Sequence, residues 1–145
     1  MFFIERVAQR VMPALNRRVY TERDLLKLCR EQGVNVCEAT TGYLGLYLVH
    51  QGRPFIILQP GLRGGLRLWV LCHEFVHCLL HAPNASTFTA SMRRKADYEA
   101  NIIAALALVP FQLVKTALSG EIQAEFDYPP ELMSIRKDIY ECYRK

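Results

Sequence analysis

Two histidines flank a glutamate in the segment His73-Glu74-Phe75-Val76-His77. On a helix, residues four apart share one face and lie about 6 Å apart along the axis, so both imidazole rings can bind one Zn²⁺ ion. Glu74 follows the first histidine and can act as a general base toward a water molecule that the metal activates. The spacing therefore predicts metal-assisted hydrolysis, with two histidine ligands and one glutamate as proton acceptor.

The same three positions also arise by chance on amphipathic helices, where the histidines are hydrogen-bonded core residues. The residues before the motif are mostly apolar, namely Leu66, Leu68, Trp69, Val70 and Leu71. A helix with this composition is buried enough to hold a shaped site that excludes water. This context favours a metal site over a chance match.

His81 lies four residues beyond His77 and is the next histidine to consider. An unbroken helix carries it about 12 Å along the axis from His73, which is too far for one ion. The extended zinc motif that recruits a third histidine uses a glycine turn, and Leu80 stands at that glycine's position. We expect His81 to end the helix, and a role behind the ligands is the less favoured alternative.

The third ligand is then expected on the following helix, which offers Asp97, Glu99 and Asn101. Asp97 and Asn101 are four apart and share a face, so one can bind the metal while the other orients a ligand histidine. Glu99 points about 200° away from Asp97 around a regular helix. The two acids cannot both face the metal, and at this point either of them could be the ligand.

Helices and short strands must position these residues. Phe3, Val7 and Val11 have helical spacing before Pro13. The predicted elements that follow are a helix from Thr21 to Gln32, strands at Val34–Cys37, Leu44–His50 and Pro54–Leu58, helices at about Leu66–His81 and Met92–Leu108 with a polar loop from Ala82 to Ser91 between them, a shorter helix from Pro110 to near Gly120, and a last helix from Pro129-Pro130. The expected class is α+β, with a small three-stranded antiparallel meander packed on a helical core.

Composition limits the kind of protein. The chain has 145 residues, of which 51% are hydrophobic, enough for a single domain spanning residues 1–145. The net charge of +4 is spread along the chain and predicts no nucleic-acid binding. The longest apolar run, Ile102 to Phe111, is about half the ~20 residues that span a bilayer, so no membrane association is expected. The five cysteines are odd in number and none forms a C-x-x-C pair. They predict reduced core thiols and a cytoplasmic location.

Four segments together resemble the ImmA/IrrE metallopeptidases of bacteria and their mobile elements. They are the His73–His77 motif, Leu79-Leu80-His81, Asp97-Tyr98-Glu99-Ala100-Asn101, and Ala104 to Pro110. The strand segments Gly45–Tyr47 and Phe55–Leu58 also look like that family, and the similarity covers roughly Thr21 to Pro110. The resemblance implies a stand-alone zinc peptidase with a zincin-like core around the motif helix.

The resemblance also implies roles for residues and partners. The family's zinc-binding glutamate falls on Asp97, which is one methylene shorter, and Glu99 is the alternative ligand if the helix adjusts locally. Asn101 is then expected behind the ligands. The implied substrate is a separately encoded helix-turn-helix repressor of a phage, mobile element or stress response. The alternative is a non-catalytic, zinc-containing regulatory module that binds a repressor or antitoxin.

Overall fold

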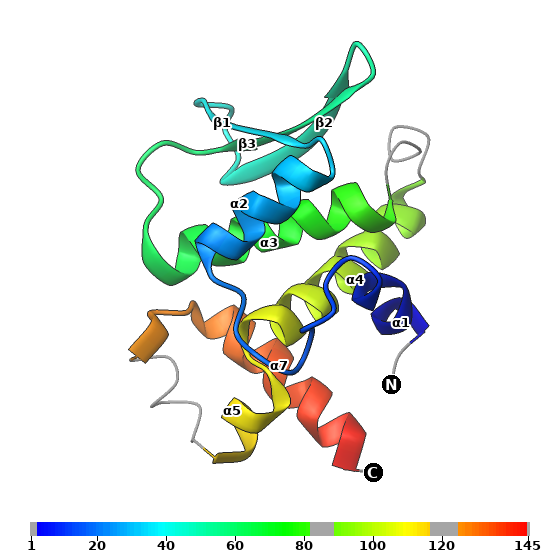
Figure 1. Ribbon diagram of the computed structural model, residues 1–145, viewed down its shortest axis with the longest axis vertical. Helices are drawn as coiled ribbons and strands as arrows, with labels where there is room; N and C mark the ends of the chain where they lie inside the picture. The colour runs from blue at the N-terminus through cyan, green and yellow to red at the C-terminus, as the bar shows by residue number, and fades with distance from the viewer. Residues whose placement is uncertain (1–2, 82–88, 117–124, 145) are drawn as a thin grey trace.

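A three-stranded sheet covers a stack of helices in the computed structural model of the chain, which describes residues 3–81, 89–116 and 125–144 (Figure 1). In chain order the elements are α1 (Phe3–Gln9), α2 (Glu22–Glu31), β1 (Asn35–Glu38), β2 (Gly45–His50), β3 (Arg53–Leu58), α3 (Gly64–Leu80), α4 (Ala90–Leu108), α5 (Phe111–Thr116) and α7 (Pro130–Arg144). The sheet lies over α3, α4 lies on the opposite side of α3, and α7 lies beyond α4. The predicted α+β class is confirmed.

The sheet has the order β1-β3-β2, so the predicted meander is wrong. β2 and β3 pair antiparallel through a tight hairpin in which Gln51 and Gly52 both have positive φ. β1 pairs parallel to β3 instead of joining β2, with Val36 opposite Ile56. The physical reason is burial: β3 carries the fully buried Ile56 and Leu58, and the most buried strand takes the central position. This leaves β2 at an edge of the sheet.

Helix α2 begins as its sequence predicts. The Thr21 hydroxyl accepts a hydrogen bond from the Asp24 backbone N–H at 3.1 Å, and the Asp24 carboxylate accepts one from the Thr21 N–H at 2.9 Å. This reciprocal pair is a capping box, which satisfies two backbone donors at the start of the helix. Gly33 follows the helix with φ +71°, as expected of a residue that turns the chain toward β1.

Helices α3 and α4 form the centre of the molecule. Helix α3 begins two residues before the predicted start, and His81 caps its C-terminus. Helix α4 begins after Thr89, whose hydroxyl accepts a hydrogen bond from the Met92 backbone N–H. Its second half is almost entirely inaccessible to solvent, because it packs between α3, α1 and α7. The two helices that must carry the proposed ligands are therefore held on several sides.

The remaining predictions have mixed outcomes. Most of the predicted loop from Ala82 to Ser91 and the predicted helix end near Gly120 lie outside the described residues. All five cysteines are free, but two of them, Cys37 and Cys142, are exposed rather than in the core. Within the described part of the chain, no helix is both long enough and apolar enough to cross a bilayer.

Candidate metal centre

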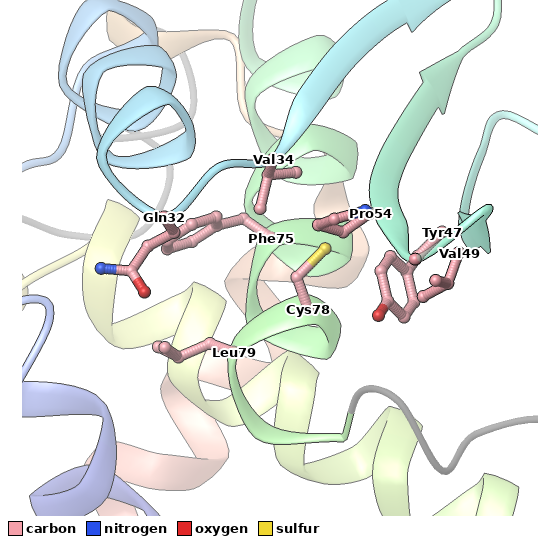
Figure 2. A pocket seen from close by; sticks show the side chains of 9 residues that line it. Gln32, Val34, Tyr47, Val49, Pro54, Phe75, Cys78 and Leu79 are labelled. Atoms are coloured by element: carbon pink, nitrogen blue, oxygen red, sulfur yellow. The ribbon is translucent and has the colours of Figure 1, made fainter.

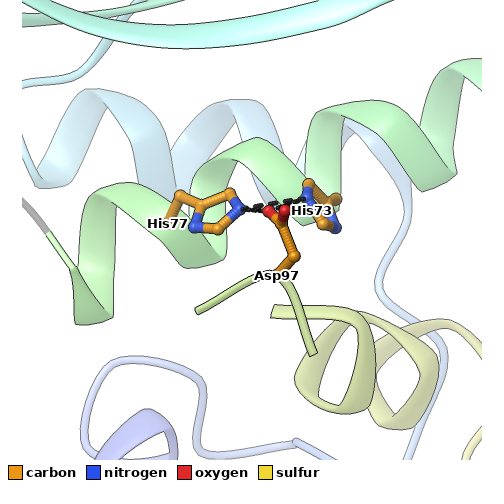
Figure 3. Close-up of side chains that lie close together, drawn as sticks. All are labelled: His73, His77 and Asp97. Carbon is orange, nitrogen blue, oxygen red and sulfur yellow. Dashed lines mark hydrogen bonds and ion pairs between the residues drawn. The ribbon is translucent and has the colours of Figure 1, made fainter. Parts of the chain in front are cut away.

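Helices α3 and α4 bring three potential ligands to one point. His73 and His77 extend from α3 and Asp97 extends toward them from α4, as Figure 3 shows. One nitrogen of each histidine and one carboxylate oxygen of Asp97 all lie within 4.8 Å of one another. It is the single such group of histidine, cysteine and acidic side chains that meets this criterion among residues 3–81, 89–116 and 125–144.

The dimensions of this triad fit a tetrahedral metal ion. The Nε2 atoms of His73 and His77 are 3.0 Å apart, and Asp97 Oδ1 lies 2.9 Å from His77 Nε2 and 3.6 Å from His73 Nε2. Ligand bonds of about 2.0–2.1 Å in a tetrahedron place ligand atoms roughly 3.3 Å apart. The donor set is also one that zinc favours: two imidazoles and one carboxylate, with room for a fourth ligand.

A hydrogen bond from α4 orients the ring of His73. Its Nδ1 lies 2.8 Å from Asn101 Oδ1. An amide oxygen only accepts, so Nδ1 carries the proton and Nε2 is left with a free lone pair. Asn101 is thus placed to orient the His73 ring, and Nε2 of His73 faces the other two side chains of the triad.

A second chain of contacts orients His77. Its Nδ1 lies 2.9 Å from Nδ1 of His81, and Nε2 of His81 lies 3.3 Å from Glu99 Oε1. With the Glu99 carboxylate accepting from His81, and His81 accepting from His77, Nε2 of His77 also keeps a free lone pair. Glu99, the alternative third ligand, is therefore the last residue of the hydrogen-bonded series His77–His81–Glu99 and does not lie within the triad. The spacing of four between His77 and His81 was the signal that could have revealed it.

Both histidines of the triad are neutral, which is the form that can bind a metal. Burial lowers the pKa of His73, although its bonds to Asn101 and Asp97 act in the opposite direction. Burial also lowers the pKa of His77 to about 4, and the neighbouring charges of His73 and His81 add to the effect. Metals bind neutral imidazole, so at neutral pH neither ring must lose a proton before it can act as a ligand.

Glu74 lies beside the triad but outside it. Its side chain is buried, with 9% of its surface exposed, and burial raises its pKa to about 7, with a further contribution from the negative charge of Asp97. Strand β2 passes directly over it at Gly45, where an added Cβ would collide with Val70 and press on Glu74. The absence of a side chain at Gly45 therefore lets the edge strand approach the carboxylate closely.

Two cavities open on either side of this centre, and both are lined by Tyr43, Gly45, Glu74 and Asp97. The first, of about 290 Å³, extends past His77 and Arg93. The second, of about 420 Å³, extends past Trp69 and Glu131. We call the two together the cleft. It follows the edge strand β2. Asp97 and Asn101 in its lining were expected from the sequence, whereas Tyr43, Arg93 and Glu131 were not indicated as part of a site.

A third cavity, of about 260 Å³, lies on the reverse face of α3, away from the metal ligands (Figure 2). Phe75, Cys78 and Leu79 of α3 face it, and Val34 and Pro54 close it from the sheet side. Tyr47 lines both this cavity and the cleft, and its hydroxyl is buried with no hydrogen-bond partner among the residues that the structure describes. No cluster of potential metal ligands among the described residues lines the reverse-face cavity, so it is separate from the triad.

Comparison with known proteins agrees with this geometry. A peptidase family model described as the IrrE N-terminal-like domain matches residues 29–134, which include the motif helix, the edge strand, α4 and the start of α7. No curated protein matches the chain. The matched region thus contains each ligand of the triad, the residues that orient them and Glu74.

Proposed function

The chain belongs to the peptidase family described as IrrE N-terminal-like, and from this premise we propose that it is a zinc-dependent endopeptidase. One observation carries the proposal. The His73–His77–Asp97 triad lies beside a buried glutamate at the middle of an open cleft. A purely structural histidine pair would not need the cleft, and a purely structural metal site would have its fourth position closed by a protein ligand.

His73, His77 and Asp97 would hold the zinc ion. When bound, zinc would supply Lewis acidity toward a carbonyl group and toward water. Aspartate is shorter than the glutamate of the family pattern, and in this structure α4 lies close enough for its carboxylate to reach both histidines. Asp97 is also the most exposed of the three, with 61% of its side chain accessible, so the open side of the site faces the cleft.

Glu74 would perform the proton transfers. A general base is most effective when its pKa lies near the working pH, and burial has moved the pKa of Glu74 to about 7. The carboxylate would accept a proton from the attacking water and pass it to the departing amine. It can do both because it lies in the wall that both cavities share.

The edge strand would hold the substrate. Among the described residues β2 pairs with β3 alone, so the backbone groups of its other side can hydrogen-bond to an extended peptide. Such a peptide would lie along the cleft between β2 and α4, above Glu74. Within the family resemblance, we propose that the peptide segment belongs to a helix-turn-helix transcriptional repressor encoded separately.

Substitution of Glu74 by glutamine tests the proposal. We expect Glu74→Gln to retain one zinc per chain and to lower the rate of repressor cleavage by about 10²–10⁴-fold, because it removes the base and leaves the ligands. Candidate substrates are helix-turn-helix repressors encoded near this gene, and zinc is measured by mass spectrometry. Glu31→Gln, the same change on the exposed end of α2, is the matched control and should cleave like the parent.

Two outcomes would overturn the proposal. Cleavage by Glu74→Gln at the parental rate would remove Glu74 from the chemistry. A parent protein that binds the repressor with the same affinity as the variant, and never shortens it, would instead identify a non-catalytic regulatory module.

A further inference from the structure

The two ends of the cleft carry opposite charges. At one end Arg93 lines the cavity beside His77. It lies one turn before Asp97 on α4, so the two side chains share the face that borders the cleft. Its guanidinium forms no ion pair with any described residue. This end of the cleft is therefore positive and available to a ligand.

At the other end Glu131 lines the cavity beside His73 and Trp69. It belongs to the first turn of α7, and its side chain is exposed. Within the described part of the chain it has no ion-pair partner either. The metal triad and Glu74 lie between this acid and Arg93, so a bound peptide would meet a positive wall on one side of the scissile bond and a negative wall on the other.

The direction of β2 relates these walls to the direction of the substrate. Leu44, just before the strand, lines the cavity at the Glu131 end, Gly45 lines both cavities, and Leu46 and Tyr47 line the cavity at the Arg93 end. The strand already pairs antiparallel on its other side, and antiparallel pairing is the slightly more stable arrangement. A peptide antiparallel to β2 has its N-terminal part beside Arg93 and its C-terminal part beside Glu131.

We propose that the cleft selects a segment with acidic side chains on the N-terminal side of the scissile bond and basic side chains on the C-terminal side. Arg93 and Glu131 are the residues that determine this preference. The inference rests on the proposed peptidase function and specifies its substrate class. It concerns binding, so binding alone can test it.

The test uses two capped peptides of identical composition, Glu-Glu-Ala-Leu-Leu-Ala-Arg-Arg and Arg-Arg-Ala-Leu-Leu-Ala-Glu-Glu. Their affinities for zinc-loaded Glu74→Gln protein are measured by fluorescence anisotropy. We expect the first peptide to bind roughly tenfold more tightly, since each of two exposed charge contacts changes from attraction to repulsion. In about 1 M salt, where the Debye length is about 3 Å, the difference should largely disappear.

The double swap Arg93→Glu with Glu131→Arg should reverse the preference. Arg94→Glu with Glu141→Arg makes the same charge changes at exposed positions that line neither cavity, and should leave the preference unchanged. Equal affinity for the two peptides, absence of binding to both, or an equal reversal by the control pair would overturn the inference. If the preference is found but the parent protein cleaves nothing, then the peptidase proposal fails and the charge selection stands.

Discussion

The two faces of helix α3 differ in what holds their side chains in place. On the face toward α4, His73 and His77 are partly exposed and are positioned by hydrogen bonds to Asn101 and His81 (Figure 3). On the reverse face, Phe75 is fully buried and lines a cavity together with apolar residues such as Val34 and Pro54 (Figure 2). The side chains of the polar face are held in place by directional hydrogen bonds, and those of the apolar face are held by close packing.

This difference separates binding from stability within one helix. Residues of the reverse face should change the free energy of unfolding when they are shortened, because burial of apolar surface is the main source of stability. Residues behind the ligands should change metal affinity, because they set the tautomer and direction of a ring without burying much surface. The two properties can therefore be altered independently, although the positions concerned are only a few residues apart.

The largest effect is expected on the reverse face. Phe75→Ala should lower the free energy of unfolding by about 3–5 kcal/mol, since it removes a fully buried ring and leaves a cavity that the core fills only partly. Urea unfolding in the presence of a chelator measures this without a contribution from bound metal. The control Phe75→Leu retains most of the volume and should cost about 1.5 kcal/mol or less. Equal costs for the two variants would show that this face is not tightly packed.

An intermediate effect is expected on the metal face. Asn101→Ala removes the acceptor 2.8 Å from His73 Nδ1 and should weaken zinc binding by about 10–100-fold. Competition with a fluorescent chelator measures that affinity. Asn101→Asp keeps an acceptor oxygen at the same position and should retain most of it. If the alanine variant binds zinc like the parent while losing stability, then the distinction between the two faces fails.

The helices were predictable because their signals are local. The capping box at Thr21 and Asp24 and the apolar spacing of the motif helix place helices α2 and α3 within two residues of their observed ends. The order of the strands in the sheet was not predictable, because an apolar run of four to six residues indicates a strand without indicating which strand it pairs with. Val36 and Ile56 are twenty residues apart and pair parallel, and that pairing depends on how β3 packs on α3.

The metal centre shows the same limit. Helix periodicity alone places Asp97 and Asn101 on one face and Glu99 on another, and the structure has this arrangement. His81 was expected mainly to end the helix, with a role behind the ligands as the less favoured alternative, and the structure places its Nδ1 next to that of His77. The charged walls of the cleft could not be foreseen, because Arg93 and Glu131 lie on different helices whose relative position depends on the packing of α7 against α4.

The smallest effect is expected at Tyr47, which lies between the two faces. Its hydroxyl is buried without a partner in the described part of the chain, so Tyr47→Phe removes an unsatisfied polar group and should leave stability unchanged or raise it by about 1 kcal/mol. Tyr128→Phe is the matched control: its hydroxyl donates to the Leu108 carbonyl at 2.7 Å, and its loss should lower stability by about 1 kcal/mol. We expect the two variants to change the free energy of unfolding with opposite signs, measured by urea unfolding in the presence of a chelator.

A loss of stability in Tyr47→Phe similar to that of Tyr128→Phe would mean that the Tyr47 hydroxyl is hydrogen-bonded, for example to water in the reverse-face cavity. The two cavities that Tyr47 separates would then share a polar boundary rather than an apolar one.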